Sequence, residues 1–111
     1  MTSLDQTLSA LAEPTRRAVV ELLRQRPRRA GELAEALELS PPAMSRHLKV
    51  LRQAAVIEDA RLDDDARVRV YRLRPERIGE LSAWIREVEG FWGAQLEAFK
   101  AHAERTRGRK R

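Results

Sequence analysis

The hydrophobic positions of the chain follow two different spacings, and the changes between them divide the chain into three parts. From residue 4 to about residue 54, apolar side chains recur every three or four residues, which gives an α-helix one apolar face. Short segments rich in β-forming residues follow, and from residue 75 the helical spacing returns. The pattern therefore predicts several short helices, a small β-hairpin and a long last helix.

The first part predicts four short helices, two of which have a recognisable starting signal. Pro14 and Pro41 fit the first turn of a helix, where the missing N–H does no harm, and Ser40 fits an N-cap. The predicted helices cover residues 4–11, 14–26, 30–38 and 41–54.

The fourth of these helices, residues 41–54, combines an apolar face with a polar side that carries no acid. Met44, Leu48 and Leu51 follow the i, i+4, i+7 rule and are predicted to point inward. Residues 40–54 hold three basic residues and no acidic one. The residues of the polar side and its flanks are Ser40, Pro42, Ala43, Ser45, Arg46, His47 and Lys49.

The β-rich part predicts two strands, residues 56–62 and 67–73, joined by a turn near residues 63–66. The alternation slips in the second strand, so the sequence leaves its buried face open. Two short helices separated by a tight turn and followed by a hairpin describe a helix-turn-helix with a wing. We therefore expect a mainly α fold with a small β-hairpin, a winged helix-turn-helix.

The last helix carries more apolar surface than a domain of this size easily covers. Its apolar positions step by three and four residues, close to a heptad seam. Part of this stripe must serve the domain's own core, and we expect the rest to form a homodimer through the first and last helices. The expected interface residues are Leu4, Leu8, Trp84, Ile85, Val88, Phe91 and Trp92.

The formal net charge of +5 is unevenly distributed. The last seven residues hold five basic groups and no acid, whereas residues 75–104 hold six acids and three basic groups. We expect a single domain over residues 1–104 and a disordered basic tail over residues 105–111. The tail either attracts phosphates nonspecifically or is neutral solubilising sequence.

Several functional classes lack the residues that they require. The chain has no cysteine, which excludes disulfides and thiolate metal sites, and no glycine-rich phosphate loop. Its two histidines have neither catalytic nor metal-ligand spacing. No apolar run is long enough to span a membrane, and the N-terminus does not resemble a signal peptide. We expect no enzymatic activity, no cofactor, no metal, and a cytoplasmic location.

A slim, acid-free helix face after a tight turn fits the major groove of DNA. Arg46 can reach a guanine edge or a phosphate, Lys49 a phosphate, and His47 can donate to a phosphate. On the hairpin, Arg67 and Arg69 are the expected minor-groove contacts. The alternatives are an ordinary solvated helix face, and hairpin arginines that pair with the neighbouring aspartates.

Three segments together resemble the ArsR/SmtB family of winged-helix transcriptional regulators: LAEPTRRAVVELLRQRP, AGELAEALELSPPAMSRHLKVLRQAAVIE and VYRL. The resemblance implies a homodimeric repressor that binds a palindromic operator through the helix at 41–54 and the wing at 56–74. It places the polar residues described above on the family's recognition helix, and Arg67 and Arg69 on its wing.

Metal sensing in this family uses cysteines in the recognition region or His/Asp pairs on the last helix. This chain has no cysteine and only His102 on that helix, so it resembles the branch without metal sites. Two alternatives stay open. One is a protein-interaction module with the winged helix as scaffold. The other is a regulator that responds to a small molecule bound at the dimer interface near Trp84 and Trp92.

Overall fold

The order of the helices and strands matches the succession that the sequence predicts. The computed structural model describes residues 2–61 and 69–109, and the turn expected near residues 63–66 lies outside them. The elements are α1 (Ser3–Leu11), α2 (Pro14–Gln25), α3 (Ala30–Ala36), α4 (Pro41–Gln53), β1 (Ile57–Arg61), β2 (Arg69–Leu73) and α5 (Pro75–Arg109).

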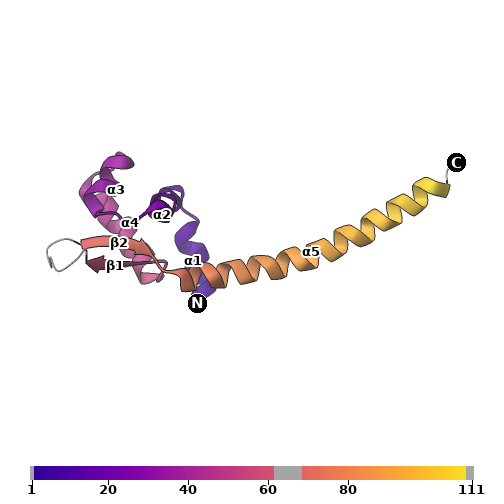
Figure 1. Cartoon of the computed structure of the whole chain (residues 1–111). Coiled ribbons are helices and arrows are strands. Elements are labelled where there is room, and N and C mark those ends of the chain that lie inside the picture. Colours follow the sequence, from indigo (N-terminus) through magenta and orange to yellow (C-terminus); the bar gives the residue numbers. More distant parts are fainter. Residues whose placement is uncertain (1, 62–68, 110–111) are drawn as a thin grey trace. The chain divides into compact units, whose positions relative to one another are not determined.

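The chain divides into two units, Met1–Leu81 and Ser82–Arg111. The first unit contains α1 to α4, the hairpin and the first turns of α5. Within it, α3 lies beside α4, and the two antiparallel strands lie side by side (Figure 1). The second unit consists of the remainder of α5. A mainly α fold with one small hairpin is therefore confirmed.

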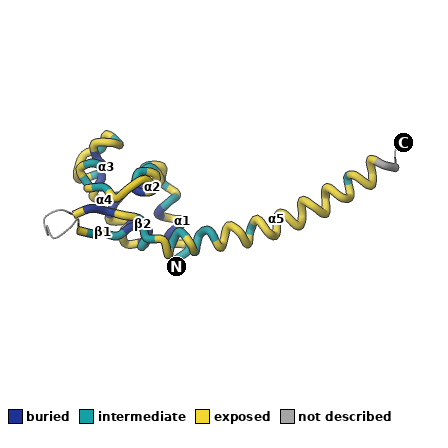
Figure 2. The backbone as a smooth tube through the Cα atoms, in the orientation of Figure 1, coloured by how far each residue is buried: buried dark blue, intermediate teal, exposed yellow. Residues whose placement is uncertain are grey.

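The core of the first unit is built from the inward faces of its helices and the start of the hairpin (Figure 2). The three residues predicted to point inward from α4 are buried. Their burial fixes the rotation of α4 about its own axis, and it therefore decides which side chains the helix exposes. The largest fully buried side chains are Leu33, Met44, Leu51, Ile57, Val19, Val56 and Thr7.

The turn between α3 and α4 is a hydrogen-bonded helix end with a left-handed residue. Glu38 has a φ of 55°, and its N–H donates to the carbonyl oxygen of Glu35 at 3.2 Å. The next N–H, that of Leu39, reaches back to the carbonyl oxygen of Ala34 at 2.9 Å. These two bonds make a Schellman motif, in which glycine is the usual left-handed residue.

The same motif ends α4 and leads the chain into the hairpin. Ala55 has a φ of 60°, and the N–H of Val56 donates to the carbonyl oxygen of Leu51 at 3.0 Å. The carbonyl oxygen of Val56 accepts from the N–H of Arg74 at 2.9 Å, which closes the base of the hairpin. Local hydrogen bonds therefore fix the exit of the chain from α4.

At the centre of β2, residues on both faces of the strand are buried. Apolar and polar residues therefore do not alternate there, and the sequence could not identify one buried face. β1 and β2 pair in antiparallel register, and the adjacent residues Val70 and Tyr71 are both buried. The other edge of β2 pairs with Arg28, because Arg28 and Tyr71 exchange two backbone hydrogen bonds of 3.1 and 2.7 Å. The hairpin is thereby fastened to the link between α2 and α3.

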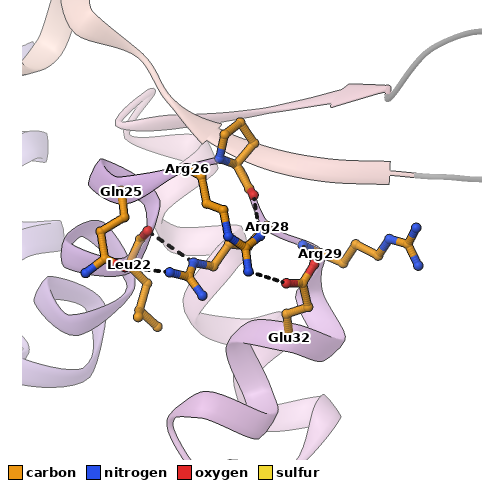
Figure 3. Close-up of polar contacts among 7 residues, drawn as sticks. Leu22, Gln25, Arg26, Arg28, Arg29 and Glu32 are labelled. Atoms are coloured by element: carbon orange, nitrogen blue, oxygen red, sulfur yellow. Dashed lines mark hydrogen bonds and ion pairs between the residues drawn. The ribbon is translucent and has the colours of Figure 1, made fainter.

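Arginine side chains hold this link in place (Figure 3). Arg28 donates to the carbonyl oxygen of Leu22 at 3.2 Å and to the side chain of Gln25 at 2.7 Å. Arg26 pairs with Glu32 of α3 at 3.0 Å. The link therefore connects α2, α3 and the hairpin, three of the elements that contact α4.

Helix α5 continues through Arg109, whereas we expected a disordered tail from residue 105. Cations near the C-terminal end of a helix interact favourably with its dipole, so Arg105 and Arg107 favour the last turns.

None of the helices in the described part of the chain is long and apolar enough to cross a membrane.

We expect Glu38→Gly to raise the free energy of unfolding by about 1 kcal/mol, because glycine adopts a positive φ without steric penalty. Glu35→Gly, three residues earlier inside α3, is the matched control and should lower it by about 1 kcal/mol. Urea denaturation monitored by circular dichroism measures both changes. Equal destabilisation by the two substitutions would contradict this account of the turn.

Candidate nucleic-acid interface

Helix α4 starts at a side-chain cap, and its burial pattern separates an inner face from an outer face. The hydroxyl oxygen of Ser40 accepts a hydrogen bond from the N–H of Ala43 at 3.3 Å, which confirms Ser40 as the N-cap. Ala43 and His47 are half-buried at the flank of the helix. The exposed residues at and after the cap include Ser40, Pro42, Ser45, Arg46 and Lys49.

The cations of this outer face have no acidic partner among the residues that the structure describes. Arg46, Lys49 and Arg52 are exposed and form no ion pair there. On α2, by contrast, Arg24 pairs with Glu21 at 3.1 Å. The absence of acids from residues 40–54 explains the difference, since no carboxylate of α4 itself can pair with these groups.

His47 differs from the other polar residues of α4 because it has an acidic partner on another helix. Its Nδ1 lies 3.7 Å from Oε2 of Glu13, and 23% of the His47 side chain is exposed. Glu13 is the N-cap of α2, and the same Oε2 accepts the N–H of Arg16 at 2.9 Å. This contact connects the start of α2 with α4, and no local pattern in the sequence marks it.

The carboxyl group of Glu13 stays ionised at neutral pH. Partial burial is the largest influence on its pKa and raises it, but hydrogen bonds from the backbone of Arg16 and Thr15, together with the nearby His47, outweigh that effect. The net result is a lowered pKa. Glu13 is therefore an anionic partner for His47 throughout the range in which histidine changes charge.

Among the described residues of the hairpin, Arg69 and Arg72 form ion pairs with acids of the neighbouring strand. Arg69 lies 3.5 Å from Asp59 across the two strands, and Arg72 lies 2.8 Å from Glu58. Both acids lie on β1, and the aspartates of the predicted turn, with which the sequence left a pairing open, lie outside the described residues. Arg67 lies outside the described residues.

The residues predicted at a dimer interface are largely accessible in the single chain. Leu4 and Val88 are half-buried, and the exposed fractions of Trp84 and Ile85 are 40% and 41%. Farther along α5 the exposed fractions rise. They are 62% for Phe91, 58% for Trp92, 63% for Leu96 and 72% for Phe99, against 38% for Leu8 on α1.

Comparison with known proteins identifies regulators of one family. The model of a family described as bacterial regulatory protein, arsR family, matches residues 13–59, from the N-cap of α2 into β1. The chain is 39% identical over 97 residues to the HTH-type transcriptional regulator Rv2034 of Mycobacterium tuberculosis, covering 87% of this chain and 85% of that protein. It is 40% identical over 58 residues to the transcriptional repressor SdpR of Bacillus subtilis, covering 52% of this chain and 64% of SdpR.

A solved structure supports the same fold. The crystal structure of the ArsR family transcriptional regulator RHA00566 superimposes with a TM-score of 0.72 at 29% sequence identity. The match covers 83% of this chain and 98% of that chain. The winged helix-turn-helix predicted from the sequence is therefore confirmed.

We expect Ser40→Ala to lower the free energy of unfolding by about 1 kcal/mol, because the N–H of Ala43 loses its acceptor at the start of α4. Ser45→Ala is the matched control, since Ser45 is exposed and its change should stay within about 0.5 kcal/mol. Urea denaturation of the two variants measures the difference. If Ser40→Ala left the free energy of unfolding unchanged, this would contradict a stabilising role for the Ser40 cap.

Proposed function

The chain belongs to the arsR family of bacterial regulatory proteins, and from this premise we propose that it is a homodimeric repressor that binds a palindromic operator. The observation that carries the proposal is the outer face of α4, where exposed cations stand without acidic partners among the described residues. Unpaired cations of this kind are available to a phosphate backbone, and their neutralisation by phosphates releases counterions from DNA.

The size and order of side chains on α4 fit the major groove of DNA. Pro42, Ala43 and Ser45 keep the first turns of the helix narrow, so the backbone can approach the base edges. Arg46 follows one turn later with a planar fork of donors, which suits the O6 and N7 atoms of guanine. Lys49 lies farther along and suits a phosphate as a point charge.

The hairpin contributes to DNA binding differently, because Arg69 has to leave Asp59 before it can contact a phosphate. In the free protein its guanidinium lies 3.5 Å from Asp59, with 57% of the side chain exposed. Exposed ion pairs of this kind contribute little to stability, so a phosphate can replace the carboxylate at small cost. We propose Arg67 and Arg69 as wing contacts that add affinity rather than sequence preference.

The apolar stripe of α5 supports a second copy of the chain as partner. Trp84, Ile85, Phe91 and Trp92 expose between 40% and 62% of their surface, and a monomer rarely exposes so large an apolar area on one helix. The hydroxyl of Ser3 also donates to the carboxylate of Glu80, which ties the start of α1 to the first turns of α5. We propose that Leu4 and Leu8 of α1 also contribute to the interface.

Two-fold symmetry then explains the form of the operator. An isologous dimer repeats every contact twice, so two copies of α4 read the same sequence in opposite directions. Two recognition helices spaced to enter successive major grooves on one side of the duplex require a palindromic site. Repression is the mode that the name of SdpR suggests for this fold, and the place of action is the cytoplasm, where bacterial DNA lies.

Selection of bound duplexes from a random DNA pool tests the proposal directly. We expect the recovered sites to share one sequence with two-fold symmetry, bound by two chains. Sites that share a sequence without symmetry would leave DNA binding in place and refute the palindrome. A purified, folded protein that retains no duplex at low salt would refute the function.

Arg46→Ala should weaken binding to the selected duplex by about 1–3 kcal/mol, because a bidentate base contact is lost. Binding to a scrambled duplex should change much less, and sedimentation should show an unchanged assembly. Arg24→Ala is the matched control, because Arg24 is an exposed arginine of α2 that pairs with Glu21. Equal effects of the two substitutions in fluorescence anisotropy would remove Arg46 from the recognition site.

Trp92→Glu should convert the dimer to a monomer, because the exposed indole would be replaced by a charge inside the proposed interface. Ala83→Glu introduces the same charge at an exposed position on the side of α5 opposite Trp92 and should leave the dimer intact. Sedimentation velocity at several concentrations distinguishes the two outcomes. A Trp92→Glu variant that dimerises as well as the parent chain would place the interface elsewhere.

A further inference from the structure

The contact between Glu13, at the start of α2, and His47 of α4 has a consequence for function as well as for helix packing. We propose that Glu13 is a positioning residue for DNA binding, which holds His47 by one ring nitrogen and leaves the other to donate to a DNA phosphate. The operator complex then contains a protonated His47, and operator binding takes up a proton. This inference rests on the proposed function, since it assigns a proton to the same recognition helix.

The position of His47 on α4 makes this role possible. His47 lies at the flank of the helix, beside the exposed Arg46, and keeps 23% of its side chain exposed. Its Nδ1 lies 3.7 Å from the carboxylate of Glu13, which leaves Nε2, one ring carbon away, as the nitrogen that can take a second partner. A helix that flanks a recognition helix lies near the phosphate backbone. The side chains between the flanking helix and the recognition helix therefore also lie near the phosphates.

Glu13 is held in a fixed place, which allows it to orient the ring. Its Oε2 accepts the N–H of Arg16 at 2.9 Å and is thereby locked at the N-terminus of α2. An anion is also stabilised there by the helix dipole. The carboxylate is therefore a fixed anchor for Nδ1, and not a mobile surface group that happens to be near.

The arginines next to Glu13 in α2 have partners of their own, and the cations next to His47 in α4 are exposed. Arg16 donates through Nε to the carbonyl oxygen of Ala10 at 2.6 Å, and Arg17 donates to the carbonyl oxygen of Leu11 at 2.8 Å. On α4 itself, Arg46 and Lys49 are exposed. Among the described residues, Glu13 is the one acid that forms an ion pair with His47.

The His47 ring can donate to both Glu13 and a phosphate only when it carries a second proton. A neutral ring has one N–H and one acceptor nitrogen, so it cannot donate to a carboxylate and a phosphate at once. A protonated ring donates from both nitrogens. A DNA phosphate on Nε2 and Glu13 on Nδ1 together favour the protonated ring, because two anions then face one cation.

The direction of the pH dependence follows from this preference. The complex holds the proton more tightly than the free protein, so the extra affinity is fully present at low pH and is lost as the pH rises through the histidine range. Glu13 has a lowered pKa and remains ionised over that range, so its own titration does not contribute. Affinity should therefore fall from about pH 6 to about pH 8.

Fluorescence anisotropy of the full chain with the selected duplex, at constant ionic strength, tests the inference. We expect the dissociation constant to rise about tenfold between about pH 6 and about pH 8. His47→Gln should bind with an almost flat pH profile. His102→Gln removes the other histidine of the chain, which lies on α5, and should keep the full pH response.

Glu13→Gln separates positioning from simple packing. Glutamine can still accept the N–H of Arg16 and cap α2, but it has no charge to stabilise a protonated ring. We expect this variant to keep its helix content, to lose affinity at low pH, and to lose most of the pH response. Nitrogen NMR of the histidine ring in the parent complex should show both ring nitrogens protonated.

The outcomes are distinguishable. A parent chain that binds the duplex with no pH dependence, or a full response retained by His47→Gln or Glu13→Gln, overturns the inference and leaves the proposed function intact. A neutral His47 ring in the NMR spectrum of the complex overturns it equally. A chain that binds no duplex at any pH overturns the proposed function and this inference with it.

Discussion

Burial of three side chains on one face of α4 is the constraint on which the candidate site depends. Met44, Leu48 and Leu51 expose at most 3% of their surface, so α4 cannot rotate about its axis without opening the core. Because a helix has a fixed angular spacing, that burial also fixes the direction of Arg46 and Lys49. The hydrophobic core of the domain thereby determines the orientation of a polar surface that it does not touch.

Electrostatics divides the cations of the domain into two groups with different roles. On the hairpin, arginines face acids of the paired strand, as Arg72 faces Glu58 in register at 2.8 Å. On α4, Arg46, Lys49 and Arg52 have no acid near in sequence and form no ion pair with the described residues, whereas the acid that does contact this helix, Glu13, pairs with His47. In the proposed DNA complex, a phosphate meets no paired carboxylate at Arg46 or Lys49, whereas at Arg69 it must displace Asp59. Each contact made by those two residues of α4 would therefore add more affinity than the contact made by Arg69.

The sequence predicted the features that depend on local spacing, and it missed those that depend on distant partners. Both faces of α4 and the cap at Ser40 follow from helical periodicity and from one hydroxyl, so they could be predicted. The pairing of Tyr71 with Arg28 joins residues far apart in the chain, and no local pattern marks it. The contact of Glu13 with His47 is of the same kind, because it depends on how two helices pack.

The long last helix shows how assembly and local stability depend on one another. Beyond residue 81, nearly every side chain described on α5 is exposed in the single chain, and the segment contains Gly90 and Gly93, which lower helix propensity. Helices in proteins owe most of their stability to the packing of an apolar face. Packing of Trp92 and its apolar neighbours against a second copy would therefore stabilise the helix that makes the contact. In the proposed dimer, dimerisation and the ordering of α5 would be one linked equilibrium, so the concentration of the protein would control how much of this helix is formed.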